Sequence, residues 1–380
     1  MSISKNIKVV KFEFFRKLIF EYISRVFAFI FTKQNIYFTY KSYLNHPAFS
    51  ELLINPPVFY SNKRNSKLLH LIQGGTEKDY TNNCIIEVID HPLSVLAPFL
   101  AKDLNCKDYI NNLELAEQIY ASKNVKKVLL ISFGQLELFK SFFTNSEILN
   151  KIQVLPLPWK NNISCTDTDS DNNLSFLFIA SDFLSKGVEI VLDAWLVFKM
   201  TNKNAQMDLV CHNFPEEKLF KLHKSITLFR NVPLKRDLKD FLYSKADVVI
   251  ATSLTDGVTP IEATSYGKPI IVFRGQHSYD FINNSNGFCI DVPINYYDEG
   301  YGSLWETDRS YFELVKHKYL NGDFDFSIIK LVDSFNFFLN NENLKLYKYN
   351  AIVKYKNSYQ VINRNIELME IYKKHYPKND

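Results

Sequence analysis

The stretch DVVIATSLTDGVTPIEATSYGKPIIVF, residues 247–273, decides the fold of this chain. It opens with a run of β-branched residues that is typical of a buried strand. A short loop then leads into the helix-forming segment 259–267, and a second apolar run follows at 268–273. A strand, a helix and a second strand in so short a stretch predict a βαβ unit with two parallel strands.

The same alternation precedes this stretch. Its strand segments are continuous Val/Ile/Leu runs rather than apolar and polar residues in turn, which indicates parallel strands buried on both faces, joined by right-handed helical crossovers. The pattern therefore predicts a doubly wound α/β domain. The expected strands are 174–180, 205–212, 226–232, 247–253 and 268–273, and the expected helices are 187–200, 215–225, 236–246 and 259–267.

The first half of the chain has a similar character, and a polar run, NNISCTDTDSDNN, separates the halves as a linker. After Asp308 the pattern is helical to the end. Two Rossmann-like domains of this kind would face a cleft lined by the carboxyl ends of both sheets, where ligands of this architecture bind. The expected strands of the first half are 66–72, 83–89, 125–132 and 151–159, with a helix at 133–143. The predicted parts are an N-terminal amphipathic helix (1–34), a Rossmann-like domain (35–160), the linker (161–173), a second Rossmann-like domain (174–340) and C-terminal helices (341–380).

Composition excludes several classes of protein. The chain has 380 residues, of which 46% are hydrophobic, so two domains can fold without stabilising disulfide bonds or metal ions. The net charge of +4 and the lack of a basic strip with interleaved aromatics argue against nucleic acid as a partner. The cysteines are odd in number, scattered and never spaced C-x-x-C, which argues against a disulfide framework and a zinc site and favours a reducing, cytoplasmic setting. They are Cys84, Cys106, Cys165, Cys211 and Cys289.

Residues 5–33 are basic and apolar, with apolar positions at helical spacing. Charged residues interrupt every window long enough to span a bilayer, and no uninterrupted apolar stretch precedes a signal-peptide cleavage site. One hypothesis is a basic amphipathic helix on an anionic membrane surface, which would place the protein peripherally on the inner face of a membrane. The other is a helix that packs on its own protein core or on a second subunit.

Four segments in order resemble the GT-B glycosyltransferases whose C-terminal half is of the retaining, family 4 type. They are FLFIASDFLSKGVEIVLDAW (176–195), VPLKRDLKDFLYSKADVVIATS (232–253), TDGVTPIEATSYGKPIIV (255–272) and GQHSYDFINNSNGFCIDV (275–292), and closing helices follow at 341–372. The N-terminal half resembles the family less, because no opening strand with a glycine-rich loop precedes Ile36. The resemblance implies a GT-B fold, a nucleotide-sugar donor, transfer with retention and no metal.

The resemblance also implies roles for charged residues. The family holds the donor diphosphate with an Arg and a Lys, and Lys186 stands at the Lys position whereas Ser181 stands at the Arg position. Arg274, which follows the strand 268–273, is a candidate for the missing charge, as are Arg230 and Lys235. Fixed cations would stabilise the leaving diphosphate. The alternative for Lys186 is a solvated loop lysine.

Glu262 has two interpretations. Thr259, Pro260 and Glu262 fit a capping box, in which Thr259 is the N-cap, Pro260 is the first helical residue and Glu262 returns to the N-cap amide. The resemblance instead places here the family's second motif glutamate, whose carboxylate holds the ribose hydroxyls of the nucleotide.

The family's first motif glutamate falls at Leu254, so the nearest carboxylate is Asp256. Asp256 either holds the donor sugar or starts the turn with Gly257. The backbone amides of Gly257, Val258 and Thr259, at the mouth of the helix, are candidate donors to the sugar or the phosphate.

His91, with Asp90 beside it, ends the expected strand 83–89 in the N-terminal half. Many family members have a histidine near the donor sugar at such a place, so His91 is a candidate catalytic residue together with Lys186 and Asp256. The alternative is a histidine that only stabilises the fold.

Taken with the resemblance, the sequence predicts a glycosyltransferase that moves a sugar from a UDP- or GDP-sugar to a glycan or lipid-linked acceptor, in surface polysaccharide or glycoconjugate synthesis. No metal or other cofactor is expected, and no protein general base is required if the leaving phosphate deprotonates the acceptor. The alternative is a catalytically degenerate GT-B protein that acts as a scaffold or regulatory partner of an active transferase, which Ser181 and the short Asp256 loop favour.

Overall fold

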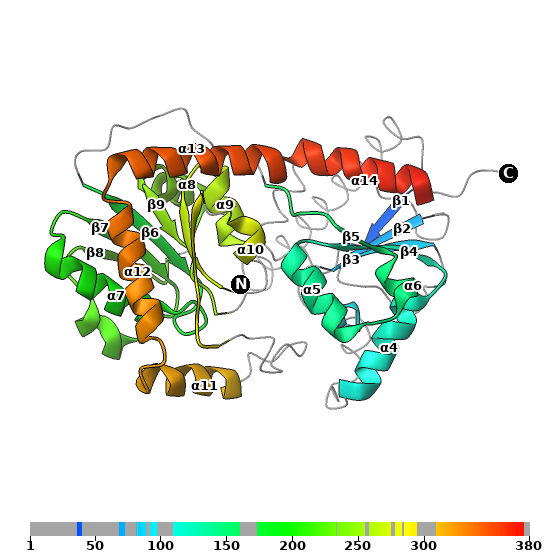
Figure 1. The fold of residues 1–380 in the computed structure, drawn as a ribbon, viewed down its shortest axis with the longest axis horizontal. Helices are drawn as coiled ribbons and strands as arrows, with labels where there is room; N and C mark the ends of the chain where they lie inside the picture. The colour runs from blue at the N-terminus through cyan, green and yellow to red at the C-terminus, as the bar shows by residue number, and fades with distance from the viewer. Residues whose placement is uncertain are drawn as a thin grey trace, which may run out of the picture. The chain divides into compact units, whose positions relative to one another are not determined.

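The computed structural model of the chain forms two compact units (Figure 1). Unit 1 contains residues up to Ile131 together with Phe139–Leu155 and Arg364–Asp380, and unit 2 contains Ser132–Leu138 and Pro156–Asn363. The structure describes residues 36–39, 68–72, 81, 83–88, 92–96, 109–159, 173–232, 234–254, 258–274, 278–282, 285–294 and 309–375. The predicted helix at 1–34 and all of the predicted linker except residue 173 lie outside these residues.

Unit 1 is built on a five-stranded parallel sheet whose strand order, β1-β2-β3-β4-β5, follows the chain. The described side chains of β2 and all those of β3 are buried, which agrees with the continuous apolar runs that predicted them. Because the strand order never reverses, the described part of this sheet has no topological switch point. The elements are β1 (Ile36–Thr39), β2 (Leu68–Ile72), β3 (Cys84–Val88), η2 (Pro92–Leu96), α4 (Tyr109–Ala121), β4 (Val125–Leu130), α5 (Phe133–Phe142), α6 (Ser146–Leu149) and β5 (Ile152–Val154).

The C-terminal helix α14 (Val361–His375) packs on this sheet from Arg364 onward. Its Leu368, Ile371 and Tyr372 share an apolar cluster with residues of β2, β3 and β4. A buried polar cluster lies beside it: Arg364 pairs with Glu87, and its Nη1 donates to the Leu155 carbonyl at 2.7 Å. The helix is therefore tied to unit 1 by both apolar and charged contacts.

Unit 2 is built on a six-stranded parallel sheet of order β11-β10-β9-β6-β7-β8. The chain enters at β6, adds β7 and β8 on one side, and then returns to add β9, β10 and β11 on the other. The switch point of the sheet therefore lies between β6 and β9. The strands are β6 (Ser175–Ala180), β7 (Gln206–Cys211), β8 (Ile226–Arg230), β9 (Val248–Ile250), β10 (Ile270–Phe273) and β11 (Gly287–Ile290).

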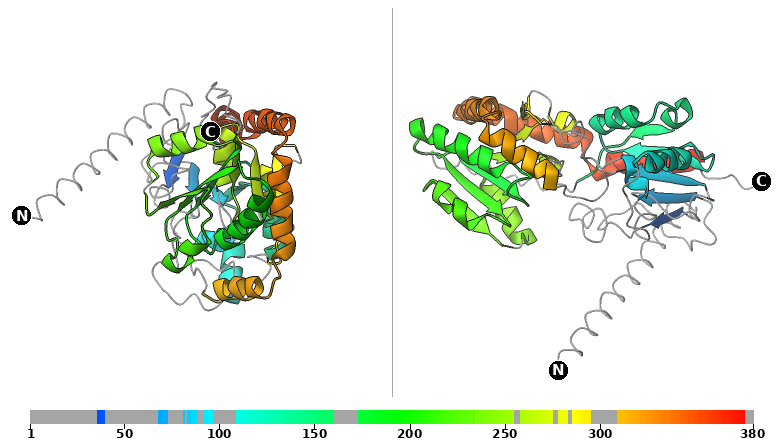
Figure 2. Two further views of the ribbon diagram at one scale, coloured as in Figure 1. Left: turned by 90° about the vertical axis from the view of Figure 1, so that its left-hand side faces the viewer. Right: turned by 90° about the horizontal axis from the view of Figure 1, so that it is seen from below.

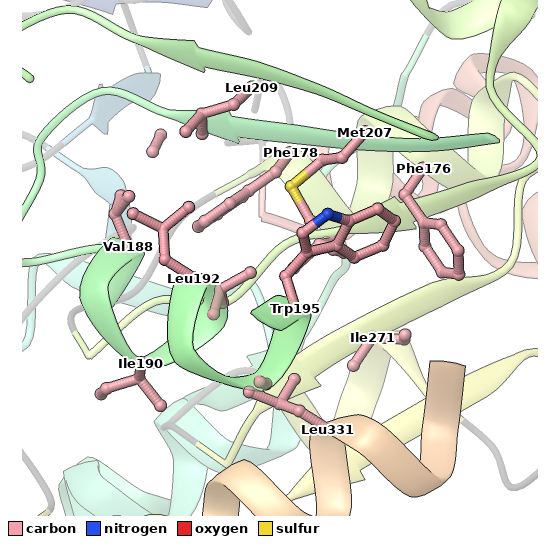
Figure 3. Close-up of a cluster of buried hydrophobic side chains, with 14 of the residues drawn as sticks. Phe176, Phe178, Val188, Ile190, Leu192, Trp195, Met207, Leu209, Ile271 and Leu331 are labelled. Carbon is pink, nitrogen blue, oxygen red and sulfur yellow. The ribbon is translucent and has the colours of Figure 1, made fainter. Parts of the chain in front are cut away.

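Helices cover both faces of this sheet. Helix α12 lies alongside α7 over one face (Figures 1 and 2), and right-handed crossovers put α8 and α9 on the other. Figure 3 shows the core under α7, where the Trp195 ring lies 5.4 Å from Phe176 in an edge-to-face arrangement. The helices are α7 (Val188–Thr201), η3 (Glu216–Lys221), α8 (Arg236–Lys245), α9 (Thr259–Ser265), α10 (Ser278–Phe281), α11 (Arg309–Leu320), α12 (Asp325–Phe337) and α13 (Asn341–Ser358).

The predicted α/β class with two parallel sheets and C-terminal helices is confirmed. Two local expectations differ from the structure. The helix expected at 215–225 is the short 3₁₀ helix η3, none of whose side chains is buried, so no apolar face holds a longer helix there. Strand β11 was not predicted from the strand pattern; Gly287 opens it, and a Cβ at this position would lie 2.0 Å from the Ile270 carbonyl oxygen. No described helix is long and apolar enough to cross a membrane.

Candidate functional site

Two loops meet where β6 and β9 end, at the switch point of the sheet of unit 2. Lys186, in the loop after β6, donates from Nζ to the Ser253 hydroxyl at 2.8 Å, in the loop after β9. Thr252 Oγ1 donates to the Lys186 carbonyl at 2.9 Å, and the Leu254 amide donates to the Ser185 carbonyl at 2.8 Å. Ligands of doubly wound sheets bind at this place, outside the carboxyl ends of the strands.

Gly187 fixes the loop that carries Lys186. It is the N-cap of α7 and has a φ of 65°, which only glycine adopts readily. A Cβ there would lie 2.7 Å from Cε2 of Phe273, on β10. The Lys-Gly pair therefore places Lys186 directly before the first turn of α7, whose N-terminus carries a partial positive charge.

Asp182 stabilises the same loop through hydrogen bonds to its carboxylate. Its carboxylate accepts hydrogen bonds from the Ser185 amide and from Asn213 Nδ2, both at 2.7 Å. Burial raises the pKa of this carboxyl, but the hydrogen bonds from Ser185 and Asn213 outweigh burial and hold the pKa below its ordinary value. Ser181, at the Arg position of the resemblance, is exposed at the end of β6.

Glu262 on α9 is buried and faces α8. The Tyr243 hydroxyl donates to its Oε2 at 3.1 Å, and Lys239 forms an ion pair with its Oε1. The capping-box prediction is wrong: the N-cap is Val258, which makes no side-chain cap hydrogen bond, and Thr259 is the first helical residue. The carboxylate binds across to α8 because Lys239 and Tyr243 offer a cation and a hydroxyl.

Tyr243 and Lys239 connect the Glu262 carboxylate to two further aromatic side chains of unit 2. Tyr243 stacks on Tyr266 with a centroid distance of 4.3 Å, and burial, followed by the Glu262 charge, raises its pKa well above the ordinary value. Lys239 Nζ lies 5.9 Å from the ring centroid of Trp159. Sequence reasoning missed both of these partners of Glu262, although Lys239 and Tyr243, four residues apart on a helix, share a face.

The other candidate cations follow strands other than β6 and β9, and Lys235 among them is the N-cap of α8, after β8. Arg274, after β10, pairs with Asp291, after β11. Arg230 ends the edge strand β8, and its Nη1 lies 3.2 Å from Oε1 of Glu216. In the described part of the chain, Lys186 is therefore the candidate diphosphate cation that lies at the switch point.

Several candidates fall outside the described residues: His91 with its neighbour Asp90, and Asp256 with Gly257. Their roles stay predictions. Val258 and Thr259 are described and lie half-buried at the start of α9. Within the described ranges, no group of three or more His, Cys, Asp or Glu side chains is placed to hold a metal ion.

No protein-family model matches the sequence, and no curated protein sequence matches it either. Solved structures do match. WaaG, a glycosyltransferase involved in lipopolysaccharide biosynthesis, is similar with a TM-score of 0.53 and 13% identity, covering 81% of this chain and 78% of WaaG. Anabaena HepE in complex with UDP matches with a TM-score of 0.52 and 14% identity over 81% of this chain and 79% of HepE. A glycosyltransferase from Rickettsia africae matches with a TM-score of 0.51 and 16% identity over 83% and 79%.

These matches show that the chain has the fold of GT-B glycosyltransferases of group 1, as the sequence resemblance predicted. At identities of 13–16% they establish the fold alone. Activity and substrates must be argued from the site.

Proposed function

We propose that the chain is a glycosyltransferase that moves a sugar, with retention, from a UDP- or GDP-sugar to a glycan or lipid-linked acceptor. The observation that carries this proposal is the ammonium group of Lys186, held by Ser253 across the switch point at 2.8 Å. The similarity to the fold of HepE, whose structure contains UDP, supports a nucleotide donor. Surface polysaccharide or glycoconjugate synthesis is the setting that such acceptors suggest.

The reaction breaks the bond between the anomeric carbon and the phosphate oxygen, and the acceptor oxygen forms the new bond. Negative charge grows on the departing diphosphate, so the Lys186 ammonium stabilises the transition state more than the ground state. The acceptor proton passes to the leaving phosphate, so no protein base is needed. Glu262 holds the ribose hydroxyls, and Asp256 and His91 are assigned to the donor sugar.

The test is titration of the purified chain with UDP-glucose, UDP-GlcNAc and GDP-mannose, followed by calorimetry and by release of free UDP or GDP. We expect binding of at least one donor, and weaker binding in Lys186→Met by roughly 10- to 100-fold, because a charge-assisted hydrogen bond is lost. Lys330→Met is the matched control, since Lys330 lies on α12 and contacts exposed Asp333 at 3.5 Å and the exposed Phe326 ring at 5.4 Å from its centroid. Neither binding nor donor hydrolysis in the wild-type chain would contradict the proposal.

A degenerate GT-B protein that regulates an active transferase is the second candidate. Two observations favour it: Ser181 replaces the Arg of the family, and both carboxylate oxygens of Glu262 already have partners on α8. This candidate predicts no turnover and no change in nucleotide binding when Lys186 is replaced. The same titration therefore separates the two.

A peripheral location on an anionic membrane is proposed through residues 5–33. Flotation with phosphatidylglycerol liposomes, with and without residues 1–33, tests it. We expect the full chain to float and the shortened chain to stay at the bottom of the gradient. Equal flotation of both would contradict this location.

A further inference from the structure

Unit 1 carries a group of lysines at the amino edge of its sheet. Two lie near the start of strand β4, one lies in the turn before that strand, and two lie in the last turn of α14. The two on β4 are partly exposed and the others are exposed. We call this set the amino-edge patch; its members are Lys123, Lys126, Lys127, Lys373 and Lys374.

Helix α14 reaches this edge because it runs against the direction of the strands. Near its start, Arg364 donates to the carbonyl of Leu155, which follows the carboxyl end of β5. At its other end, burial first and then the charges of three lysines hold the pKa of His375 below its ordinary value. The three are Lys126, Lys127 and Lys374. Lysines of the strand and of the helix therefore act on one group, although they are far apart in the sequence.

A bulge in β4 interrupts the alternation of its side chains. Successive residues of β3 pair with Val125 and Lys127, so Lys126 is an extra residue on β4. Neighbouring residues of a regular strand point to opposite faces, and a bulge re-aims them. Lys126 and Lys127 consequently both lie close enough to His375 to lower its pKa.

The charge of the patch is not compensated. Within the described residues, none of its five lysines forms an ion pair with a carboxylate. Lysines elsewhere do, as when Lys151 pairs with Glu147 at 3.5 Å. Glu370, one turn before Lys374, is exposed and makes no such pair with it. Like charges gathered in this way repel one another, so the patch costs free energy in the isolated protein.

The ordinary structural role of such residues explains only part of the patch. Lys373 and Lys374 complement the negative end of the α14 macrodipole. That role does not extend to the lysines of β4. Nor does substrate binding explain them, because ligands of parallel α/β sheets bind at the carboxyl edge, and these lysines lie at the amino edge. The charge therefore points to a partner outside the substrate site.

The composition of the patch favours a lipid surface over a protein or a nucleic acid. Protein interfaces are depleted in lysine and enriched in arginine and aromatic residues, and single-stranded nucleic acids stack their bases on aromatic rings. Segments 123–127 and 373–375 contain no Arg, Phe, Tyr or Trp and expose no large apolar side chain. Lysines are flexible point charges, which suit the phosphates of a fluid anionic membrane.

We propose that the amino-edge patch is a docking surface for anionic lipid headgroups, and that it is a second membrane contact of this chain in addition to residues 5–33. This inference rests on the peripheral membrane location proposed above and adds to it a surface of the folded unit 1. One weak signal gives only reversible membrane binding, whereas two together give stable attachment. The patch alone therefore does not hold a chain that lacks residues 1–33 through a flotation gradient.

The experiment measures co-sedimentation of the full chain with phosphatidylcholine vesicles, with and without about one-third phosphatidylglycerol, at low salt and at about 0.3 M NaCl. The patch variant is Lys126→Gln/Lys374→Gln. The matched control is Lys345→Gln/Lys356→Gln, at two exposed positions of α13. Both variants remove two positive charges, so a difference between them reports where the charges lie and not the net charge.

We expect wild type and control to bind the anionic vesicles about equally at low salt. The partition coefficient of the patch variant falls roughly 10- to 30-fold, since each lysine near an anionic surface contributes a factor of about five. Added salt weakens the binding of wild type more than that of the patch variant, because it screens the charges that the variant has lost. Neutral vesicles do not distinguish the three proteins.

Two further variants separate charge from folding. Lys126→Arg/Lys374→Arg keeps both charges and should bind as wild type does. Lys373→Gln/Lys374→Gln changes exposed side chains only and should lose binding as the patch variant does. A loss in that variant does not come from a disturbed bulge in β4.

Each outcome decides between the proposals. Wild type that binds no anionic vesicle overturns both the membrane location and the patch, and leaves the donor function standing. Equal binding of wild type, patch variant and control overturns the patch alone. Equal losses in patch variant and control assign the effect to net charge and overturn it too. So does a patch variant that still binds vesicles but loses binding to a single-stranded oligonucleotide, which would make the patch a nucleic-acid surface.

Discussion

The protein buries a carboxylate beside a cation and a tyrosine in each of its two units, and the two clusters differ in what surrounds them. In unit 1, the Glu87 and Arg364 side chains are 4% and 6% exposed, and Tyr372 is fully buried. In unit 2, the cation beside Glu262 is 20% exposed and is a lysine. The first cluster is closed to solvent, whereas the lysine of the second cluster is partly exposed.

The two carboxylates also differ in how far their partners lie from them along the sequence. His70 lies between Glu87 and Tyr372, with its Nε2 3.1 Å from the Glu87 carboxylate and its Nδ1 2.6 Å from the Tyr372 hydroxyl. Arg364 and Tyr372 belong to the C-terminal helix, so this cluster closes unit 1 across most of the sequence. In contrast, Lys239 and Glu262 belong to consecutive helices of one sheet. A buried ion pair therefore docks a C-terminal helix in unit 1 and joins two consecutive helices in unit 2.

Arg364→Met should have the largest effect on stability. It leaves the Glu87 carboxylate buried without its arginine, which costs about 3–5 kcal/mol of unfolding free energy. Urea unfolding, with tryptophan fluorescence and circular dichroism, measures it. Arg230→Met is the matched control, since its partner Glu216 is 79% exposed and the loss should stay below about 1 kcal/mol. Equal losses for the two variants would show that the unit 1 cluster is not a docking contact.

Tyr243→Phe and Tyr372→Phe sharpen the comparison. Tyr243 donates directly to a carboxylate, and a hydrogen bond to a charged group is worth about 1.5–3 kcal/mol. Tyr372 is bonded to the His70 ring, and its loss should cost about 0.5–1.5 kcal/mol. Both are measured by urea unfolding at neutral pH. A larger loss for Tyr372→Phe would reverse the proposed difference between the clusters.

Asp182 is a third carboxylate, which accepts hydrogen bonds from the Ser185 backbone amide and the Asn213 side-chain amide. Its replacement should have the smallest effect on the free energy of unfolding. Its pKa is lowered in the folded state, so the unfolded chain binds the proton more readily. The stabilisation is therefore complete above the ordinary Asp pKa of about 4 and is lost as the pH falls through the folded value. Asp182→Asn should cost below about 1 kcal/mol at pH 7, because the group is only partly buried.

The measurement for Asp182 is urea unfolding of wild type and Asp182→Asn at pH 7, 5, 4 and 3. We expect the difference between the two proteins to be constant from pH 7 to 5 and to shrink below about pH 4. Asp333→Asn, at an exposed pair on α12, is the control with no expected difference. A difference that grows as the pH falls would contradict the lowered pKa.

Much of unit 2 could be predicted from the sequence because its signals are local. The apolar runs before Ala180 and after Asp247 gave β6 and β9, and the helical spacing between them gave α7 and α8. The segment 215–225 failed because its helical spacing had no apolar face to bury. Strand β11 was missed because only the neighbouring strand β10, through its Ile270 carbonyl, explains why Gly287 is there.

The residues of the candidate site also divide into those that the sequence predicted and those that it did not. The family resemblance pointed to Lys186 and Glu262, because Lys-Gly after a strand and a glutamate in the next helix are short, readable patterns. Their partners could not be predicted from the sequence. Ser253 accepts the hydrogen bond from Lys186 only because β9 lies next to β6, and Lys239 pairs with Glu262 only because α8 and α9 pack together.

By itself, the sequence of this protein determined two parallel α/β units, their crossover helices and the segments that resemble a glycosyltransferase. Periodicity, turn residues and apolar runs are properties of neighbouring residues, so they can be recognised in one dimension. The tertiary structure decided the strand order, the switch point, the docking of α14 through Arg364 and the partners of the Glu262 carboxylate. These depend on contacts between residues far apart in the chain, which form only when the sheets assemble and charges must find partners away from water.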